Sequence, residues 1–254
     1  MPSQAGARHP VRRAVVLLGL GMAVAIAGAV IWWWSPGEDL SAWRNGPPPR
    51  AWAAWRRQEE RWREEGSRRR VQYSYVGLAQ VSVEMQLAVL VGEDIDFFGH
   101  GPVDVDAILE AVEEHRPGER LRGASTITQQ LAKNLYLSGE RTIWRKLKEI
   151  RLAWWLERRL GKRRILELYM NVVEFGPGLL GVEAAARHYY EVGAAGLTGE
   201  QAAGLAAAVP APGRDNPSTA SRRWQNRRAI IMRRMAKADW LRTRLAALSA
   251  PERE

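Results

Sequence analysis

The sequence predicts a mostly α-helical protein in which one membrane-spanning helix precedes a globular domain. Residues 14–34 form an apolar run without a charge. The stretch 124–175 contains no proline and carries apolar residues at the i, i+3, i+4 and i+7 spacing of an amphipathic helix. Segments that alternate as strands do are few, and apolar residues make up 46% of the 254-residue chain, enough for a core.

The run 14–34 has the length of a transmembrane helix. At about 1.5 Å per residue it spans roughly 30 Å, the thickness of a bilayer's hydrocarbon core. Arginines precede it and acidic residues follow it, so the positive-inside rule places a cytoplasmic tail at 1–13 and the remainder outside. The alternative is a cleaved signal peptide with Ala25-Ile26-Ala27 as its cleavage site.

Residues 35–70 are predicted to be a linker that contains a Trp/Arg-rich helix. Trp52, Trp55 and Trp62 recur at helical spacing after a proline-rich break. Two interpretations stay open. The helix lies on the outer membrane face, or it packs its tryptophan stripe against the main domain.

The main domain is predicted over 71–240, with a C-terminal tail at 241–254. Tyr73–Val81 is the best candidate for a strand. An alanine-rich helix over 199–211 should stop at Pro210, and a strongly basic helix should follow over 222–234.

The composition of the chain excludes several kinds of functional site. The chain has no cysteine and four histidines, which excludes a disulfide scaffold, a thiol nucleophile and a cysteine-ligated zinc site. The net charge of +10 suggests an anionic partner. Lysine is rare, with 5 residues among 38 cationic ones, and four of the five lie between 133 and 162.

The first candidate for catalysis is the pair Glu93-Asp94, which follows the apolar run 87–91. Desolvation at an apolar wall raises the pKa of a carboxyl group and suits it for general acid or base catalysis. A simple charge pair at a helix end is the alternative.

The second candidate lies at 122–134. Ser125 and Thr126 are good N-cap residues, and the helix that they start offers free N–H groups to an anion. Thr126, Gln130 and Lys133 share one polar face of that helix. An ordinary solvent-exposed face is the alternative.

The third candidate lies at 141–149. Arg141, Arg145 and Glu149 share a helix face at a spacing of four, with Lys148 beside them. The cations could clamp a pyrophosphate and would favour the ionised form of Glu149. Salt bridges on a solvated helix are the alternative. A fourth block, 162–176, is predicted to be an apolar helix that contains Asn171, and its predicted role is structural.

Together these blocks resemble the peptidoglycan glycosyltransferases, family 51 of the glycosyltransferases, over residues 71–238. The blocks that carry the resemblance are GEDIDFFGH, GASTITQQLAKNLYLS, RTIWRKLKE, KRRILELYMNVVEFGPG and GVEAAARHYY. The resemblance is to the monofunctional branch, and no S-x-x-K or K-T-G motif of a transpeptidase is present.

This resemblance implies a lysozyme-like fold with a small membrane-associated subdomain. It implies polymerisation of lipid II into glycan strands at the cytoplasmic membrane. Glu93 matches the general base, Asp94 its supporting neighbour, and Glu149 the carboxylate that assists the pyrophosphate leaving group or holds a divalent metal such as Mg or Mn. The substrate-binding positions that it implies are Lys133, Arg141, Lys148, Ser125, Gln130 and Asn134.

The sequence departs from the family pattern at Pro102, where glycine is usual, and at Tyr190-Glu191-Val192, where the family usually continues with Phe-Gly-Lys. A lytic transglycosylase or lysozyme-like hydrolase is the rival function, but it needs no pyrophosphate clamp. Other cell-wall synthesis proteins are further candidate partners, and nucleic acid is not expected as one.

Overall fold

The computed structural model describes residues 9–35, 40–50, 52–106, 109, 125–137, 139 and 142–249. The chain divides into two compact units, Met1–Asp39 and Leu40–Glu254. The described residues are mostly helical, which confirms the predicted fold class.

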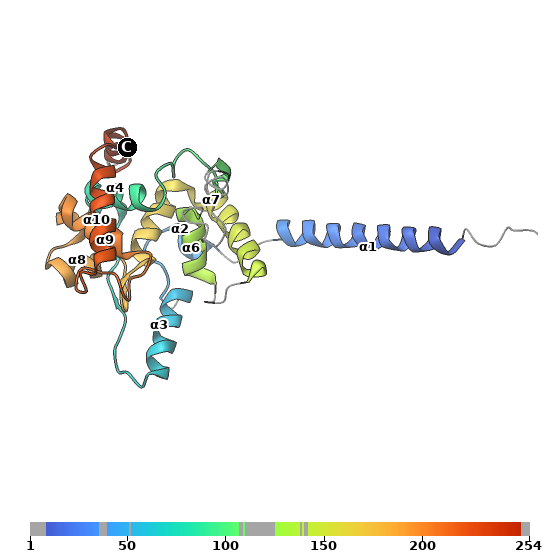
Figure 1. Cartoon of the computed structure of the whole chain (residues 1–254), viewed down its shortest axis with the longest axis horizontal. Helices are drawn as coiled ribbons and strands as arrows, with labels where there is room; N and C mark the ends of the chain where they lie inside the picture. Colours follow the sequence, from blue (N-terminus) through green and yellow to red (C-terminus); the bar gives the residue numbers. More distant parts are fainter. Residues whose placement is uncertain are drawn as a thin grey trace, which may run out of the picture. The chain divides into compact units, whose positions relative to one another are not determined.

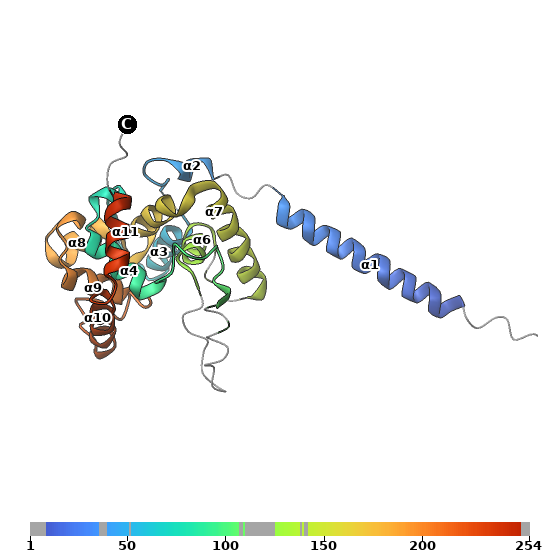
Figure 2. The same cartoon turned by 90° about the horizontal axis from the view of Figure 1, so that it is seen from above.

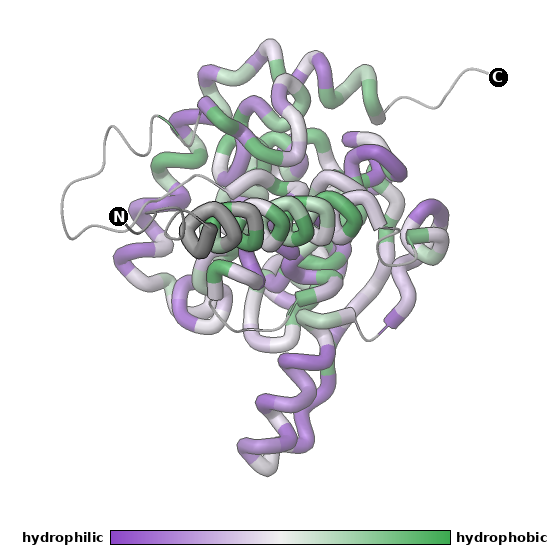
Figure 3. Tube along the Cα trace, turned by 90° about the vertical axis from the view of Figure 1, so that its right-hand side faces the viewer, coloured by the Kyte–Doolittle hydropathy of each residue, from purple (hydrophilic) through white to green (hydrophobic). Residues whose placement is uncertain are grey.

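The first unit contains the helix α1 (His9–Trp34). Its segment Leu17–Trp34 has a mean hydropathy of 1.9, and α1 is long and apolar enough to cross a membrane. Figure 3 shows the apolar character along the coloured part of this helix. The predicted span 14–34 lies inside α1.

The second unit is built from helices (Figure 1). Their bounds are α2 (Ser41–Arg44), α3 (Ala53–Glu64), α4 (Val83–Glu93), α6 (Ile127–Tyr136), α7 (Ile143–Val172), α8 (Val182–Tyr190), α9 (Gly199–Ala208), α10 (Arg222–Met235) and α11 (Asp239–Ser249), with short 3₁₀ turns η1 (Leu78–Gln80) and η2 (Ala194–Gly196).

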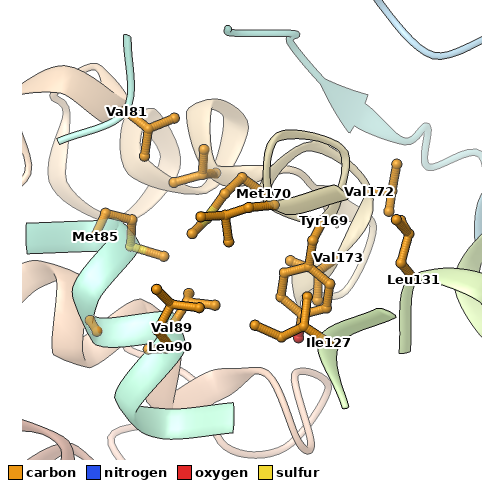
Figure 4. Close-up of a cluster of buried hydrophobic side chains, with 14 of the residues drawn as sticks. Val81, Met85, Val89, Leu90, Ile127, Leu131, Tyr169, Met170, Val172 and Val173 are labelled. Carbon is orange, nitrogen blue, oxygen red and sulfur yellow. The ribbon is translucent and has the colours of Figure 1, made fainter. Parts of the chain in front are cut away.

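The core forms around α4, whose residues 85–91 are all buried. This helix packs against α9, α10 and α11, while α6 packs against α7. Figure 4 shows how the two groups meet: Met85 and Leu90 of α4 face Tyr169 and Met170 near the end of α7, with Ile127 of α6 alongside. The C-terminal end of α4 and the N-terminal end of α6 are therefore held by one continuous core.

A small sheet lies beside this core. Its order is β1-β3-β2, with β1 (Gln72–Tyr73) parallel and β2 (Glu174–Gly176) antiparallel to β3 (Leu179–Leu180). The predicted strand over 73–81 is therefore wrong beyond its first residue. Asn171 explains the path of the chain there, because its buried side chain bonds both the N–H and the carbonyl of Val76.

Local signals place the C-terminal helices as predicted. Thr198 caps α9 by accepting the N–H of Gln201, and α9 ends at Ala208, ahead of Pro210. Ser221 caps α10 in the same way. The predicted C-terminal tail at 241–254 is wrong over residues 241–249, which belong to α11 and bury Leu241 and Leu245 in the core.

The Trp/Arg-rich helix is α3, and it packs against α6. Trp52 and Trp62 are buried, and a Cβ added to Gly178 would lie 2.0 Å from the Trp62 ring. Trp52, Trp55 and Tyr73 form a set of edge-to-face ring contacts. The structure thus favours packing of the tryptophan stripe on the domain.

Two backbone features were not predicted. Helix α7 is broken at Gly161, whose φ of 71° and ψ of 160° are essentially restricted to glycine. Figure 2 shows the resulting bend in α7. Glu191 ends α8 in the left-handed conformation with φ 59°, at the position where the family pattern usually has glycine.

Candidate active site

Glu93 is the last residue of α4, and both of its carboxylate oxygens are engaged. Its Oε1 accepts from Nη2 of Arg227 at 2.6 Å, and its Oε2 accepts from Nε2 of Gln130 at 2.9 Å. The same guanidinium nitrogen of Arg227 also donates to the carbonyl of Gly92 at 3.0 Å. Through Arg227, helix α10 therefore fixes the end of α4 and at the same time orients the carboxylate of Glu93.

A buried tyrosine fixes the amide that contacts Glu93. The Tyr169 hydroxyl donates to Oε1 of Gln130 at 2.9 Å, which leaves the amide nitrogen turned toward Glu93. Tyr169 is fully buried, and this desolvation raises the pKa of its hydroxyl well above the usual range. The hydroxyl stays protonated and keeps donating.

Asp94 connects α4 to the start of α6. Its Oδ2 accepts from the N–H of Ile127 at 2.8 Å, and its Oδ1 pairs with Nε2 of His100 at 2.7 Å. The other ring nitrogen of His100 lies 2.6 Å from the Gly101 carbonyl. The bond to Asp94 raises the pKa of His100 to about 9, so the ring is a cation that donates from both nitrogens.

Residue Pro102 participates in the same connection through its carbonyl. It accepts from the Thr126 hydroxyl at 3.0 Å and from the Gln129 side chain at 3.1 Å. Thr126 also caps α6, as predicted. A proline at this family position therefore leaves the loop tied to α6, because the bonds use its oxygen and not an N–H.

Glu149 lies on α7 and is 4% exposed. Its two oxygens accept from Arg145 Nη1 at 2.9 Å and from Lys146 Nζ at 2.6 Å. The Lys146 ammonium also donates to Ser125 at 3.2 Å and Gln129 at 2.8 Å. This lysine therefore links the second carboxylate to the start of α6.

A cavity of about 330 Å³ opens over Glu149. Lys133 lines it, and burial lowers the pKa of this lysine while Glu149 opposes the shift. The lining residues are Arg57, Ser125, Gln130, Lys133, Gly139, Arg145, Lys146 and Glu149. One carboxylate is thus accompanied by four cationic side chains.

A larger cavity of about 920 Å³ opens over Glu93. It is bordered mainly by α10 and by the segment after α9, and Arg222, Arg223, Arg227 and Arg234 lie along it. The two cavities share Ser125 and Gln130. They therefore adjoin as two parts of one groove, with Glu93 in one part and Glu149 in the other.

Comparison with known proteins agrees with this geometry. Residues 59–236 match the family model described as transglycosylase. The chain belongs to the transglycosylase family. This membership confirms the resemblance found in the sequence, together with the lysozyme-like fold class and the enzyme class, a peptidoglycan transglycosylase.

Three curated relatives named biosynthetic peptidoglycan transglycosylase illustrate the similarity. The Bordetella avium protein is 39% identical over 206 residues, covering 79% of this chain and 86% of its own. The Shewanella amazonensis protein is 47% identical over 180 residues, covering 70% and 69%. The Methylobacillus flagellatus protein is 48% identical over 143 residues, which cover 56% of this chain and 62% of that relative.

The structure of this transglycosylase brings five of the predicted site residues into the groove: Glu93, Glu149, Ser125, Gln130 and Lys133. Asp94 supports them from the α4–α6 junction. Asn134 is half-buried on α6, and Lys148 is exposed on α7. Arg141 lies outside the described residues.

Sequence reasoning missed several residues of this transglycosylase's site, among them Arg57, Lys146 and Arg227 in the groove and the buried Tyr169 behind Gln130. The rarity of lysine was a signal that could have identified Lys146. The structure places Lys146, and not the predicted Lys148, against Glu149. Nothing in the local pattern pointed to Arg227, which is 134 residues from Glu93 in sequence.

The surroundings of Glu149 do not fit a divalent metal. Both of its oxygens accept from cationic side chains, which repel a divalent cation, and the described residues that line its cavity include no second carboxylate. Among the described residues, no group of three or more acidic or histidine side chains could hold a metal ion. We therefore derive no step through a metal.

Proposed function

We propose that this transglycosylase polymerises lipid II into linear glycan strands. The 4-hydroxyl of an acceptor lipid II attacks the anomeric carbon of the growing chain. The bond from that carbon to the undecaprenyl pyrophosphate breaks, and the pyrophosphate leaves with the bonding electrons. The single observation that carries this proposal is a groove with a carboxylate in one part and a cation-surrounded carboxylate in the other.

Glu93 is the proposed general base. It lies in the larger part of the groove, which has room for a sugar, and its side chain is 10% exposed. Arg227 and Gln130 hold the two oxygens in a fixed orientation. A fixed carboxylate can accept the proton of the hydroxyl as the new bond forms. Asp94 is the proposed support, since it holds the α4–α6 junction.

The Glu149 part of the groove is the proposed site of the leaving group. Departure of a pyrophosphate concentrates negative charge, and preorganised cations stabilise it most where water is excluded. Lys133, Arg145 and Lys146 supply such charges, and Glu149 holds two of them in place. The resemblance adds Arg141, Lys148 and Asn134 as proposed donor contacts.

Helix α1 is the proposed anchor in the cytoplasmic membrane. Its length and apolarity fit a single span, and the flanking charges favour a cytoplasmic N-terminus with the catalytic domain outside. Both substrates carry a lipid, so an anchored enzyme meets them at a raised effective concentration.

The test is gel analysis of labelled lipid II incubated with the full-length protein in detergent. The wild type should form a ladder of glycan polymers, and Glu93→Gln should form none. Glu64→Gln, an exposed glutamate on α3, is the matched control and should keep the ladder. Normal polymer from Glu93→Gln would overturn the assignment of the base.

A second arm uses finished glycan as the substrate and separates synthesis from degradation. A lytic transglycosylase or hydrolase would shorten the glycan and leave lipid II untouched. We expect polymer from lipid II and no shortening of the glycan. A degradative enzyme releases no pyrophosphate, so it would not need four cations around one carboxylate.

A further inference from the structure

We propose that Arg57, on α3, contacts the diphosphate group of the donor and makes α3 a wall of its binding site. This inference rests on the proposed function. It adds a residue from a segment that precedes the family-matched stretch 59–236 and that carried no motif in the sequence.

The placement of α3 supports this role. The helix packs against α6 and is held by the buried rings of Trp52 and Trp62. Arg57 lies between these two anchors and lines the same cavity as Lys133, Arg145 and Glu149. A rigidly packed helix can present a cation to the groove in a fixed position.

A backbone contact holds the guanidinium at the edge of the cavity. Nη1 of Arg57 donates to the carbonyl of Leu137, the residue that ends α6. A guanidinium has five N–H donors, so this bond does not exhaust it. Beside it lies Gly139, where an added Cβ would come 3.7 Å from the Arg57 Cδ, an ordinary contact distance.

The excess positive charge of the cavity favours the binding of an anion. Arg57, Lys133, Arg145 and Lys146 face the single carboxylate of Glu149. Burial lowers the pKa of both Arg57 and Lys133, and Arg145 adds to the shift of each, while Glu174 opposes it at Arg57 and Glu149 opposes it at Lys133. A diphosphate diester carries two negative charges and would relieve this repulsion.

An unpaired donor on the same wall also points to a ligand. The buried Nε of Arg145 has no hydrogen-bond partner within the described parts of the chain. A buried N–H without an acceptor is costly unless a ligand or water satisfies it. A phosphate oxygen bound between Arg57 and Arg145 would supply that acceptor.

The competing explanation is that Arg57 only caps the C-terminal end of α6. A structural cap would affect thermal stability and leave anion affinity unchanged. The test therefore measures affinity directly, by calorimetric titration of inorganic pyrophosphate into the full-length protein in detergent at low ionic strength.

We expect Arg57→Gln to weaken pyrophosphate binding about tenfold and Arg57→Lys about threefold. Lysine keeps the charge but loses the planar fork that suits phosphate. Arg63→Gln, an exposed arginine on the same helix, removes the same charge away from the cavity and should bind as the wild type does.

Wild-type affinity in folded Arg57→Gln, with or without a lower melting temperature, would overturn the proposal. If Arg57→Gln does not fold, wild-type affinity in Arg57→Lys would overturn it. Glycan formation from lipid II by the wild type is measured in a separate experiment. A wild type that binds pyrophosphate through Arg57 yet forms no glycan would reject the proposed function and leave the anion contact standing.

Discussion

The two carboxylates of the groove differ in the side chains that bond them directly. Glu93 is held by one guanidinium and one neutral amide, with a buried tyrosine behind the amide. Glu149 is bonded by two cations, and two more line its cavity. The same side chain type is therefore bonded by one cation in one part of the groove and by two in the other, although arginines line both parts.

This difference separates the chemical roles. A neutral sugar hydroxyl needs an oriented acceptor for its proton, and Arg227 and Gln130 hold the Glu93 carboxylate in one orientation. A pyrophosphate needs compensating charge, and the carboxylate there serves to position cations. Substitutions in the Glu93 part should therefore change turnover, and substitutions in the Glu149 part should change affinity for the donor as well.

After the loss of polymer expected for Glu93→Gln, the largest effect should follow Lys133→Ala. Removing a partly desolvated charge from the pyrophosphate site should lower kcat/KM for lipid II by roughly 100-fold, since hydrogen bonds to charged groups contribute about 1.5–3 kcal/mol each. Initial rates over a range of lipid II concentrations measure it. Lys237→Ala, an exposed lysine after α10, is the control. A near-wild-type rate for Lys133→Ala would make this lysine structural and remove the contrast between the two parts.

A smaller effect, about tenfold, should follow Arg227→Ala. This change removes the bond that orients Oε1 of Glu93 while Gln130 still holds Oε2, so kcat should fall with little change in KM. Arg227→Lys should recover part of the loss, and the exposed Arg233 on the same helix provides a control as Arg233→Ala. A rise in KM with kcat unchanged would instead place Arg227 in substrate binding.

The same contrast explains what could be predicted from the sequence. Thr126, Pro210 and the run 14–34 act through neighbours in the chain, and their effects were predicted. Arg227 and Arg57 act across tertiary contacts whose partners lie 134 and 80 residues away. Spacing along a helix cannot locate such partners, because they depend on how separate helices pack.

Around Glu149 the spacing within α7 was a usable signal, because Lys146 lies three residues before Glu149 and shares its face, whereas the adjacent Lys148 does not. Lys148 and Lys146 both lie close to this residue in sequence, and only the orientation of α7 against α6 decides that Lys146 meets Ser125 and Gln129. The break at Gly161 also escaped prediction, because a single glycine in a helical pattern is usually tolerated.

The smallest effect concerns pH and involves His100, which is bonded to Asp94 next to Glu93. The pKa of His100 is raised to about 9 by its bond to Asp94, against an unfolded value near 6.5. A raised pKa contributes stability that is fully present below pH ~6.5 and is lost as pH rises through ~9. The melting temperature should therefore fall by a few degrees between pH 6.5 and 9.5, because a neutral ring cannot donate to both Asp94 and the Gly101 carbonyl.

Thermal unfolding of His100→Gln across this pH range tests the assignment. The variant should be less stable than the wild type at pH 6.5, and this difference should shrink by pH 9.5. His188→Gln, which changes an exposed histidine on α8, should keep the wild-type slope. A wild-type slope in His100→Gln would mean that the junction of Asp94 with α6 does not depend on the imidazolium.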